Sequence, residues 1–264
     1  MSRGDIAAAM LTRHVMTPLS AALVFNAEEP CDLVAANLEA REFDNAPVID
    51  GAGDVIGYIN EVDARRSIEA SLRAAFRPLS AAHVVGSDTP LSELLNRLLM
   101  ADFLHVVGGS GIVGLVTPSD FNKQAGRAYF YLLVSDLEIG LADRLRTSGF
   151  HEEELLACLP SKRRRSVRKR LSEQHEHDVA ADAIAAMDFK DLLMIAESKD
   201  LVSGLNAVVD QVGRTVDAEL VALRNDVMHL VKTMAVDQRA SIERLGVLDA
   251  QLRGLLDQVA AATG

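Results

Sequence analysis

Cysteine, long apolar runs and metal-ligand clusters are scarce or absent in this chain of 264 residues. Its two cysteines, Cys31 and Cys158, each lie in an apolar stretch, which favours reduced thiols over a disulfide framework. No stretch reaches about 18 consecutive uncharged apolar residues, and Met1–Met10 lacks the apolar run of a signal peptide. The sequence therefore predicts a cytoplasmic protein without a membrane span.

The histidines do not predict a metal centre. His175 and His177 flank Glu176, but a two-residue spacing does not place two side chains on one helix face. No further ligand cluster is nearby, so we expect no metal site.

Proline is unevenly distributed, and its distribution divides the chain. After Arg127 only Pro160 remains, and the apolar residues adopt the spacing of helices. A chain of this length can form two domains, each with its own core. We expect one domain over residues 10–127 and an all-α helical bundle over residues 128–264.

The first of these segments contains a duplication, with repeats of about 10–70 and 71–127. The matching residues, copy by copy, are Pro18–Ala22 and Pro78–Ala82, Pro30 and Pro90, Phe43 and Phe103, and Gly57–Asp63 and Gly114–Asp120. Each copy predicts a short strand, a helix, two strands and a closing helix start. Glycines at Gly51–Gly53 and Gly108–Gly111 suit hairpin turns, and no lysine follows to make the second a phosphate loop.

These residues resemble the tandem cystathionine-beta-synthase (CBS) domain family, an α+β fold of two β-α-β-β-α units. In that family a Gly-x-x-Thr/Ser-x-x-Asp ending contacts an adenosine ligand, and Gly114, Thr117 and Asp120 match it. By the resemblance, Thr117 and Asp120 bind the ribose or phosphates of AMP, ATP or S-adenosylmethionine. A carboxylate can accept both ribose hydroxyl protons, and a helix start offers N–H groups to phosphate. Both residues are also ordinary helix-capping residues.

The first copy departs from this pattern. Asn60 stands in place of the threonine while Asp63 is retained, so Asn60 and Asp63 define a second, altered candidate site. His105 stands where the first copy has Pro47. One functional ligand site is expected rather than two.

Helical spacing in the remaining chain predicts seven helices. They cover Tyr129–Arg146, Glu152–Leu159, His177–Met187, Lys190–Glu197, Leu201–Val209, Arg214–Ala235 and Ser241–Ala261. The last of these helices carries an apolar stripe formed by Ile242, Leu245, Leu248, Leu252, Leu255 and Val259. The stripe predicts either a dimer interface or the core of the bundle itself, and we favour the core.

One segment of this half carries candidate catalytic residues. On a continuous helix, Asn225 and His229 would share a face away from the apolar stripe, with Arg224 at its flank. Arg-Asn-x-x-x-His in an all-α domain resembles the HEPN family (higher eukaryotes and prokaryotes nucleotide-binding), which includes metal-independent ribonucleases. The resemblance implies a homodimer whose arginines and histidines meet across the interface. Imidazole can transfer a proton near neutral pH, and guanidinium can stabilise charge developing on phosphate.

The same resemblance adds an early acidic residue. Glu138 matches it best and could orient the arginine or histidine, or could be an unpaired surface charge. Two other Arg-x-x-x-x-His matches, Arg146–His151 and Arg170–His175, lack the asparagine.

A basic run stands out in a chain of formal charge −11. It comprises Lys162, Arg163, Arg164, Arg165, Arg168, Lys169 and Arg170. It predicts equally an RNA-phosphate contact or a solvated helix face balanced by nearby acidic residues. No tryptophan occurs in the chain, no aromatic residue lies within the run, and no DNA-recognition motif is present, so base stacking is not expected.

Together the two resemblances imply a ligand-regulated, metal-independent endoribonuclease, and the resemblance to the HEPN family also implies a toxin or phage-defence setting. The alternative is a non-catalytic nucleotide sensor that dimerises or binds another protein.

Overall fold

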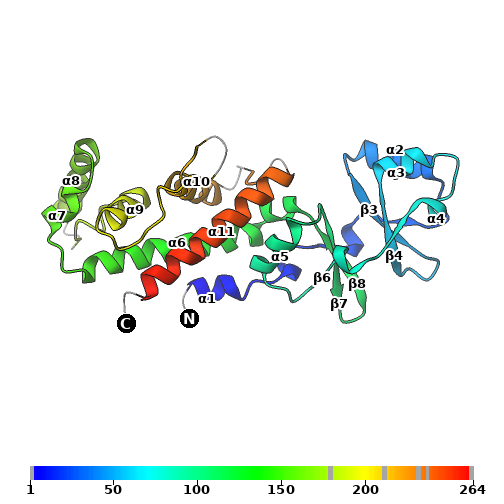
Figure 1. Cartoon of the computed structure of the whole chain (residues 1–264), viewed down its shortest axis with the longest axis horizontal. Helices are drawn as coiled ribbons and strands as arrows, with labels where there is room; N and C mark the ends of the chain where they lie inside the picture. The colour runs from blue at the N-terminus through cyan, green and yellow to red at the C-terminus, as the bar shows by residue number, and fades with distance from the viewer. Residues whose placement is uncertain (1–2, 178–180, 210–212, 230–232, 236–237, 262–264) are drawn as a thin grey trace. The chain divides into compact units, whose positions relative to one another are not determined.

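The computed structural model describes residues 3–177, 181–209, 213–229, 233–235 and 238–261. It divides the chain into two compact units, with the main boundary between Gly126 and Arg127. An α+β unit holds described residues 10–126 and 238–242, and a helical unit holds residues 3–9, 127–235 and 243–261. The two small sheets belong to the α+β unit (Figure 1).

The two copies of the α+β unit have the predicted order of elements. The first contains β2 (Phe25–Asn26), α2 (Cys31–Ala40), β3 (Asn45–Ile49), β4 (Val55–Asn60) and α3 (Glu61–Arg66). The second contains β6 (Val84–Gly86), α5 (Leu91–Leu98), β7 (Leu104–Gly108), β8 (Gly111–Val116) and the 3₁₀ segment η4 (Pro118–Asn122). A short helix, α4 (Leu72–Ala75), lies between them in sequence.

The strand registers also repeat. Val48 pairs with Gly57 and Val106 with Gly114, and each copy has a register shift immediately after its valine. Pro47 and His105 each precede that valine, which confirms that His105 occupies the position of Pro47.

Each sheet is completed by a strand that precedes the other copy in sequence. The two-residue strand β1 (Thr17–Pro18) pairs with β8, and β5 (Arg77–Pro78) pairs with β4. The resulting strand orders are β1-β8-β7-β6 and β2-β3-β4-β5. The sequence did not predict this exchange, although both strands end at the prolines that open the repeated Pro-Leu-Ser-Ala-Ala segments.

Glycine is required where each exchanged strand pairs with the other copy. A Cβ atom on Gly114 would lie 2.5 Å from the carbonyl oxygen of Thr17 and 3.2 Å from the sulfur of Met16. A Cβ atom on Gly57 would overlap the carbonyl oxygen of Arg77 and the ring of Phe76. Only a residue without a side chain allows these backbones to approach so closely.

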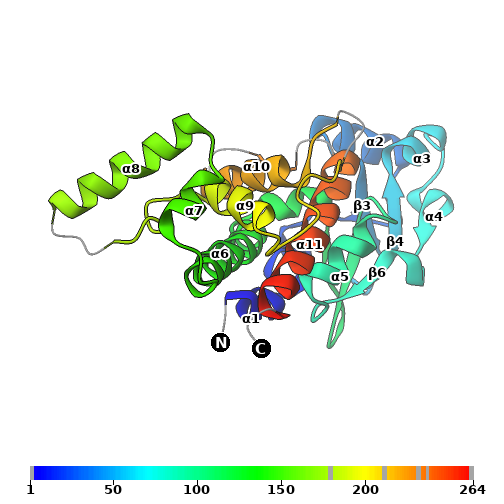
Figure 2. The same cartoon turned by 60° about the vertical axis from the view of Figure 1, so that its left-hand side comes forward.

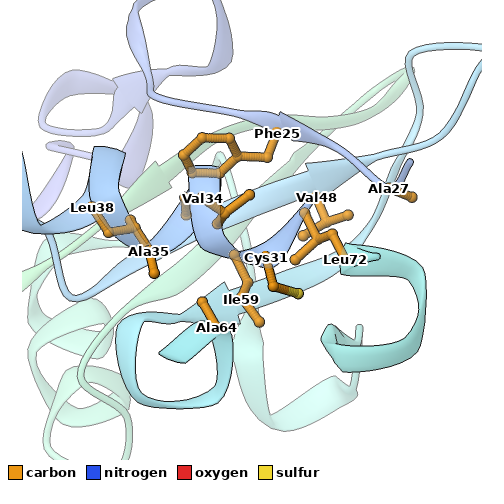
Figure 3. Close-up of a cluster of buried hydrophobic side chains, with 11 residues drawn as sticks. Phe25, Ala27, Cys31, Val34, Ala35, Leu38, Val48, Ile59, Ala64 and Leu72 are labelled. Carbon is orange, nitrogen blue, oxygen red and sulfur yellow. The ribbon is translucent and has the colours of Figure 1, made fainter. Parts of the chain in front are cut away.

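The first copy packs its helices on one face of its sheet. Figure 3 shows α2 contributing Cys31, Val34 and Leu38 to a cluster that also contains Val48 and Ile59 of the sheet. Cys31 is fully buried and not disulfide-bonded, and burial raises the pKa of its thiol. Cys31 is thus buried, as predicted, whereas Cys158 is only half-buried.

The helical unit is built around two long helices. Its elements are α1 (Arg3–Ala8), α6 (Gln124–Thr147), α7 (Glu152–Ala157), α8 (Ser161–Glu176), α9 (Phe189–Ser198), α10 (Val216–Met228) and α11 (Gln238–Ala261). Figures 1 and 2 show α6 and α11 side by side, and Tyr129 of α6 hydrogen-bonds Asp249 of α11. The apolar stripe of α11 is buried, which confirms core packing for it.

Two predicted helices are wrong in the described residues. A helix was predicted over His177–Met187, but residues 181–187 contain a turn instead. In this turn Asp182 accepts a hydrogen bond from the N–H of Ala185. Residues 201–209 are also non-helical, because α9 ends before Asp200 and Gly204, both with positive φ. Conversely, α8 was not among the predicted helices.

No helix in the described ranges is both long enough and apolar enough to cross a membrane.

Replacing Gly114 by alanine should lower the free energy of unfolding by roughly 1–3 kcal/mol, because the added methyl group overlaps the backbone of β1. Urea unfolding of the variant and the parent measures this difference. Gly109→Ala is the matched control, since its Cβ would meet no atom within 4 Å. Equal effects of the two substitutions would contradict the close approach of β1 to β8.

Candidate functional site

A cavity of about 300 Å³ lies in the α+β unit and is lined by residues of both copies. Its lining residues are Thr17, Ala21, Ala22, Leu23, Glu42, Phe43, Asp44, Asn45, Ala46, Pro47, Asp102, Phe103, Leu115, Thr117, Ser119 and Asp120. Thr117 and Asp120, predicted from the second copy, are thus brought together at one cavity. The sequence did not reveal that Thr17, from the exchanged strand β1, joins them.

The carboxylate of Asp120 is buried, with 5% of the residue exposed, and it organises the cavity wall. It accepts a hydrogen bond from the N–H of Thr117 at 2.7 Å and one from the hydroxyl of Thr17 at 3.3 Å. Lys123 lies 2.6 Å away and neutralises it. Asp120 therefore fixes the position of both threonines, and each of these three side chains presents polar atoms near the cavity.

The corresponding position in the first copy is filled differently. Asn60 caps α3 by accepting a hydrogen bond from the N–H of Asp63 at 2.7 Å. Asp63 forms an ion pair with Arg77 at 2.6 Å, and the hydrogen bond from Arg77 lowers the pKa of its carboxyl. Arg77 lies on β5, the counterpart of the β1 strand that carries Thr17. The first copy thus has an arginine where the second has a small hydroxyl residue, while the carboxylate is ion-paired in both copies.

His105 does not line the cavity. It is fully buried, and its ring contacts Phe103 and Tyr58 with centroids 5.3 and 6.1 Å apart. Neither ring nitrogen has a hydrogen-bond partner among the described residues. Burial lowers the pKa of His105 to about 4, so the ring is neutral at pH 7. This departure from the first copy is a feature of the core.

The Arg-Asn-x-x-x-His residues do not lie on one helix. Helix α10 ends at Met228, and His229 follows it with extended backbone angles, φ −105° and ψ 92°. The predicted continuation to Ala235 is therefore wrong at His229 and at residues 233–235, while residues 230–232 lie outside the described residues. The shared helical face of Asn225 and His229 is not formed. Both side chains are exposed, and Arg224 is half-buried.

Arg127 accounts for the way in which this helix ends. Its guanidinium is buried and donates hydrogen bonds to the carbonyl oxygens of Asp226, at 2.9 Å, and His229, at 3.5 Å. A cation at a helix C-terminus satisfies carbonyl groups that have no partner within the helix. Glu138 is half-buried on α6, and no hydrogen bond or ion pair joins it to another residue of the described chain.

The basic run forms the N-terminal and central turns of α8, and much of it is used for packing. Arg163 forms ion pairs with Asp188 and with the fully buried Asp191 of the α9 N-terminus, and Arg170 also contacts both. Arg164 donates three hydrogen bonds to backbone carbonyl oxygens of residues 156, 157 and 159. These arginines hold α8 to its neighbours.

The remaining basic side chains are exposed. Arg168 pairs with Glu153 at 2.6 Å, and Lys169 lies 3.5 Å from Glu173. Lys162 and Arg165 form no ion pair within the described ranges. Figure 2 shows most of α8 extending beyond α7 and α9. The run thus combines a structural face with an exposed basic one.

No protein-family model matches the chain, and no curated protein does. Among solved structures, similar ones include a CBS-domain hemolysin-like protein of Oenococcus oeni (16% identity, TM-score 0.37, covering 45% of this chain and 91% of that one). Others are the CBS domain of a bacterial CNNM/CorC family Mg²⁺ transporter with ATP (18%, 0.40, 48% and 92%) and CbpB with c-di-AMP (14%, 0.42, 48% and 91%). A little under half of this chain is thus similar to CBS-domain structures. Identities and TM-scores this low carry no information about function.

Replacing Arg163 by alanine should destabilise the helical unit by about 2 kcal/mol, because the buried carboxylate of Asp191 loses its closer cation. The exposed Arg165 is the control, and Arg165→Ala should change stability by less than about 0.5 kcal/mol. Thermal and urea unfolding monitored by circular dichroism would show the difference. If both variants unfold alike, the basic run does not anchor α8.

Proposed function

We propose that the α+β unit is a sensor module that binds one adenosine-type molecule in the cavity beside Thr117 and Asp120. The observation that carries the proposal is the position of these two residues, matched by sequence to a nucleoside-binding motif, on the wall of a cavity of about 300 Å³. That volume lies at the lower end of the roughly 300–1,000 Å³ typical of small-molecule sites.

The chemistry of the lining fits the two ends of a nucleoside. Leu23, Phe43 and Pro47 supply apolar surface for a purine ring. The carboxylate of Asp120 and the hydroxyl oxygens of Thr17 and Thr117 supply acceptors for ribose hydroxyls. The size of Arg77 supports one site rather than two, because this long side chain stands beside Asp63 where the second copy has the small Thr17 beside Asp120.

Sensing also requires that the ligand bind one conformation more tightly than another. The cavity is suited to this because its wall includes β1, which belongs to the first copy in sequence and to the second copy's sheet in space. A ligand that contacts Thr17 and Asp120 together therefore favours the arrangement in which the two copies are joined.

Asp120→Asn should weaken adenosine binding by roughly ten-fold or more, because the amide can still accept the Thr117 hydrogen bond but provides a weaker acceptor for ribose hydroxyls. Asp63→Asn is the matched control, since it makes the same change at the equivalent residue of the first copy. It should leave the affinity unchanged in isothermal titration calorimetry. Equal losses in both variants would move the site away from Asp120.

Metal-independent RNA cleavage by a homodimer is the second candidate function, with the helical unit as effector. It is supported by the exposure of Asn225 and His229, and by the absence of any side-chain hydrogen bond or ion pair for them within the described chain. Arg224, half-buried beside them, and Glu138 on α6 complete the candidate set. The exposed Lys162 and Arg165 of α8 would contact RNA phosphates. Without such activity, the helical unit would act as a dimerisation or protein-binding module.

His229→Ala should abolish cleavage of a labelled mixed-sequence RNA in EDTA, since imidazole is the proton-transfer group of this hypothesis. His151→Ala, at another Arg-x-x-x-x-His match, should retain it. Cleavage is followed on gels with and without adenosine, AMP, ATP and S-adenosylmethionine. Full activity of the His229 variant would eliminate the assignment, and no cleavage by the parent protein in any condition would favour the non-catalytic module.

A further inference from the structure

The charge of the cavity lining points to a more specific ligand class. We infer, building on the proposed adenosine-type site, that the cavity selects ligands that are uncharged or positively charged and rejects those with a phosphate chain. The accepted class comprises nucleosides and sulfonium nucleosides, and the rejected class comprises nucleoside mono-, di- and triphosphates.

Every ionisable residue of the lining is acidic. Glu42, Asp44, Asp102 and Asp120 contribute carboxylates, and no lysine, arginine or histidine is among the lining residues of the described chain. Glu42 and Asp102 are exposed at the rim and form no ion pair with any described residue. A phosphate entering this cavity would meet negative charge with no new cation to balance it.

The nearest cation is already engaged. The ammonium group of Lys123 lies 2.6 Å from Asp120, 2.8 Å from the carbonyl oxygen of Val15 and 2.9 Å from the hydroxyl of Thr17. An ammonium group has three donors, so these three oxygens account for its hydrogen-bonding capacity. If Lys123 turned to a phosphate, it would leave the buried carboxylate of Asp120 unpaired, which is unfavourable.

The backbone does not supply the expected phosphate site either. From the sequence, a helix start after Thr117 should present free N–H groups. Instead the chain forms the five-residue 3₁₀ segment η4, whose first residue, Pro118, has no N–H. The N–H groups of Thr117 and Asp120 donate to the Asp120 carboxylate and to the Thr117 carbonyl oxygen. Of the N–H groups at the start of η4, the one on Ser119 is left for a phosphate, and the ammonium group of Lys123 is already engaged.

A positive ligand would gain from the same arrangement. A sulfonium or ammonium group near Glu42 and Asp102 would be attracted through partly solvated space, so the effect should weaken as salt rises. S-adenosylmethionine and S-adenosylhomocysteine form a suitable pair of probes, because they differ by one methyl group and one positive charge. Adenosine and AMP form the second pair, differing by one phosphate.

Titration calorimetry of the full chain at low salt tests the inference with adenosine, AMP, ATP and the two sulfur nucleosides. We expect adenosine to bind at least ten-fold more tightly than AMP or ATP, and S-adenosylmethionine several-fold more tightly than S-adenosylhomocysteine. The double variant Glu42→Gln, Asp102→Asn should raise the affinity for AMP and ATP several-fold relative to the affinity for adenosine. The control double variant Glu69→Gln, Glu93→Gln removes two exposed charges outside the cavity and should change none of the affinities.

The outcomes separate this inference from the proposed site. If ATP binds as tightly as adenosine and Asp120→Asn weakens both, the adenosine-type site stands and the charge selection is wrong. Improvement of ATP binding in the control variant as well would also refute selection by the cavity rim. If none of the five probes binds, the adenosine-type site and the charge selection are both wrong.

Discussion

The contact between β1 and Gly114 is the constraint on which the proposed site depends. Because Gly114 has no side chain, the backbone of Thr17 can lie directly against β8. That position brings the hydroxyl of Thr17 to Asp120 and gives Lys123 two of its three oxygen partners. Moving β1 away would remove part of the cavity wall and would also weaken the neutralisation of a buried carboxylate.

The two copies place different side chains beside the carboxylate that ends the repeated motif. Thr17 and Arg77 occupy equivalent exchanged strands, and both neighbour the carboxylate that ends the repeated motif. The small hydroxyl leaves room beside Asp120, whereas the guanidinium reaches Asp63 and pairs with it. A side chain on a two-residue strand therefore distinguishes the copies, in addition to the difference between Asn60 and Thr117.

The sequence predicted those features that repeat or that bury an apolar stripe. The duplication, the order of strands and helices in each copy, and the buried face of α11 follow from such patterns. The strand exchange could not be predicted, because two-residue strands have no period and their partners are remote in sequence. Helix α8 was missed because only Val167 of it is buried, and arginine contacts rather than apolar packing hold it. The end of α10 depends on Arg127, which is also distant in sequence.

The strand exchange also determines the order in which the chain can fold. Thr17 and Pro18 are synthesised long before Gly114, so β1 has no partner strand until nearly the whole module has been made. The first sheet must likewise wait for Arg77 and Pro78. Since each copy needs a strand from beyond its own hairpin, neither can reach its native sheet alone. Long-range pairing of this kind makes folding slower and joins the two copies into one cooperative unit.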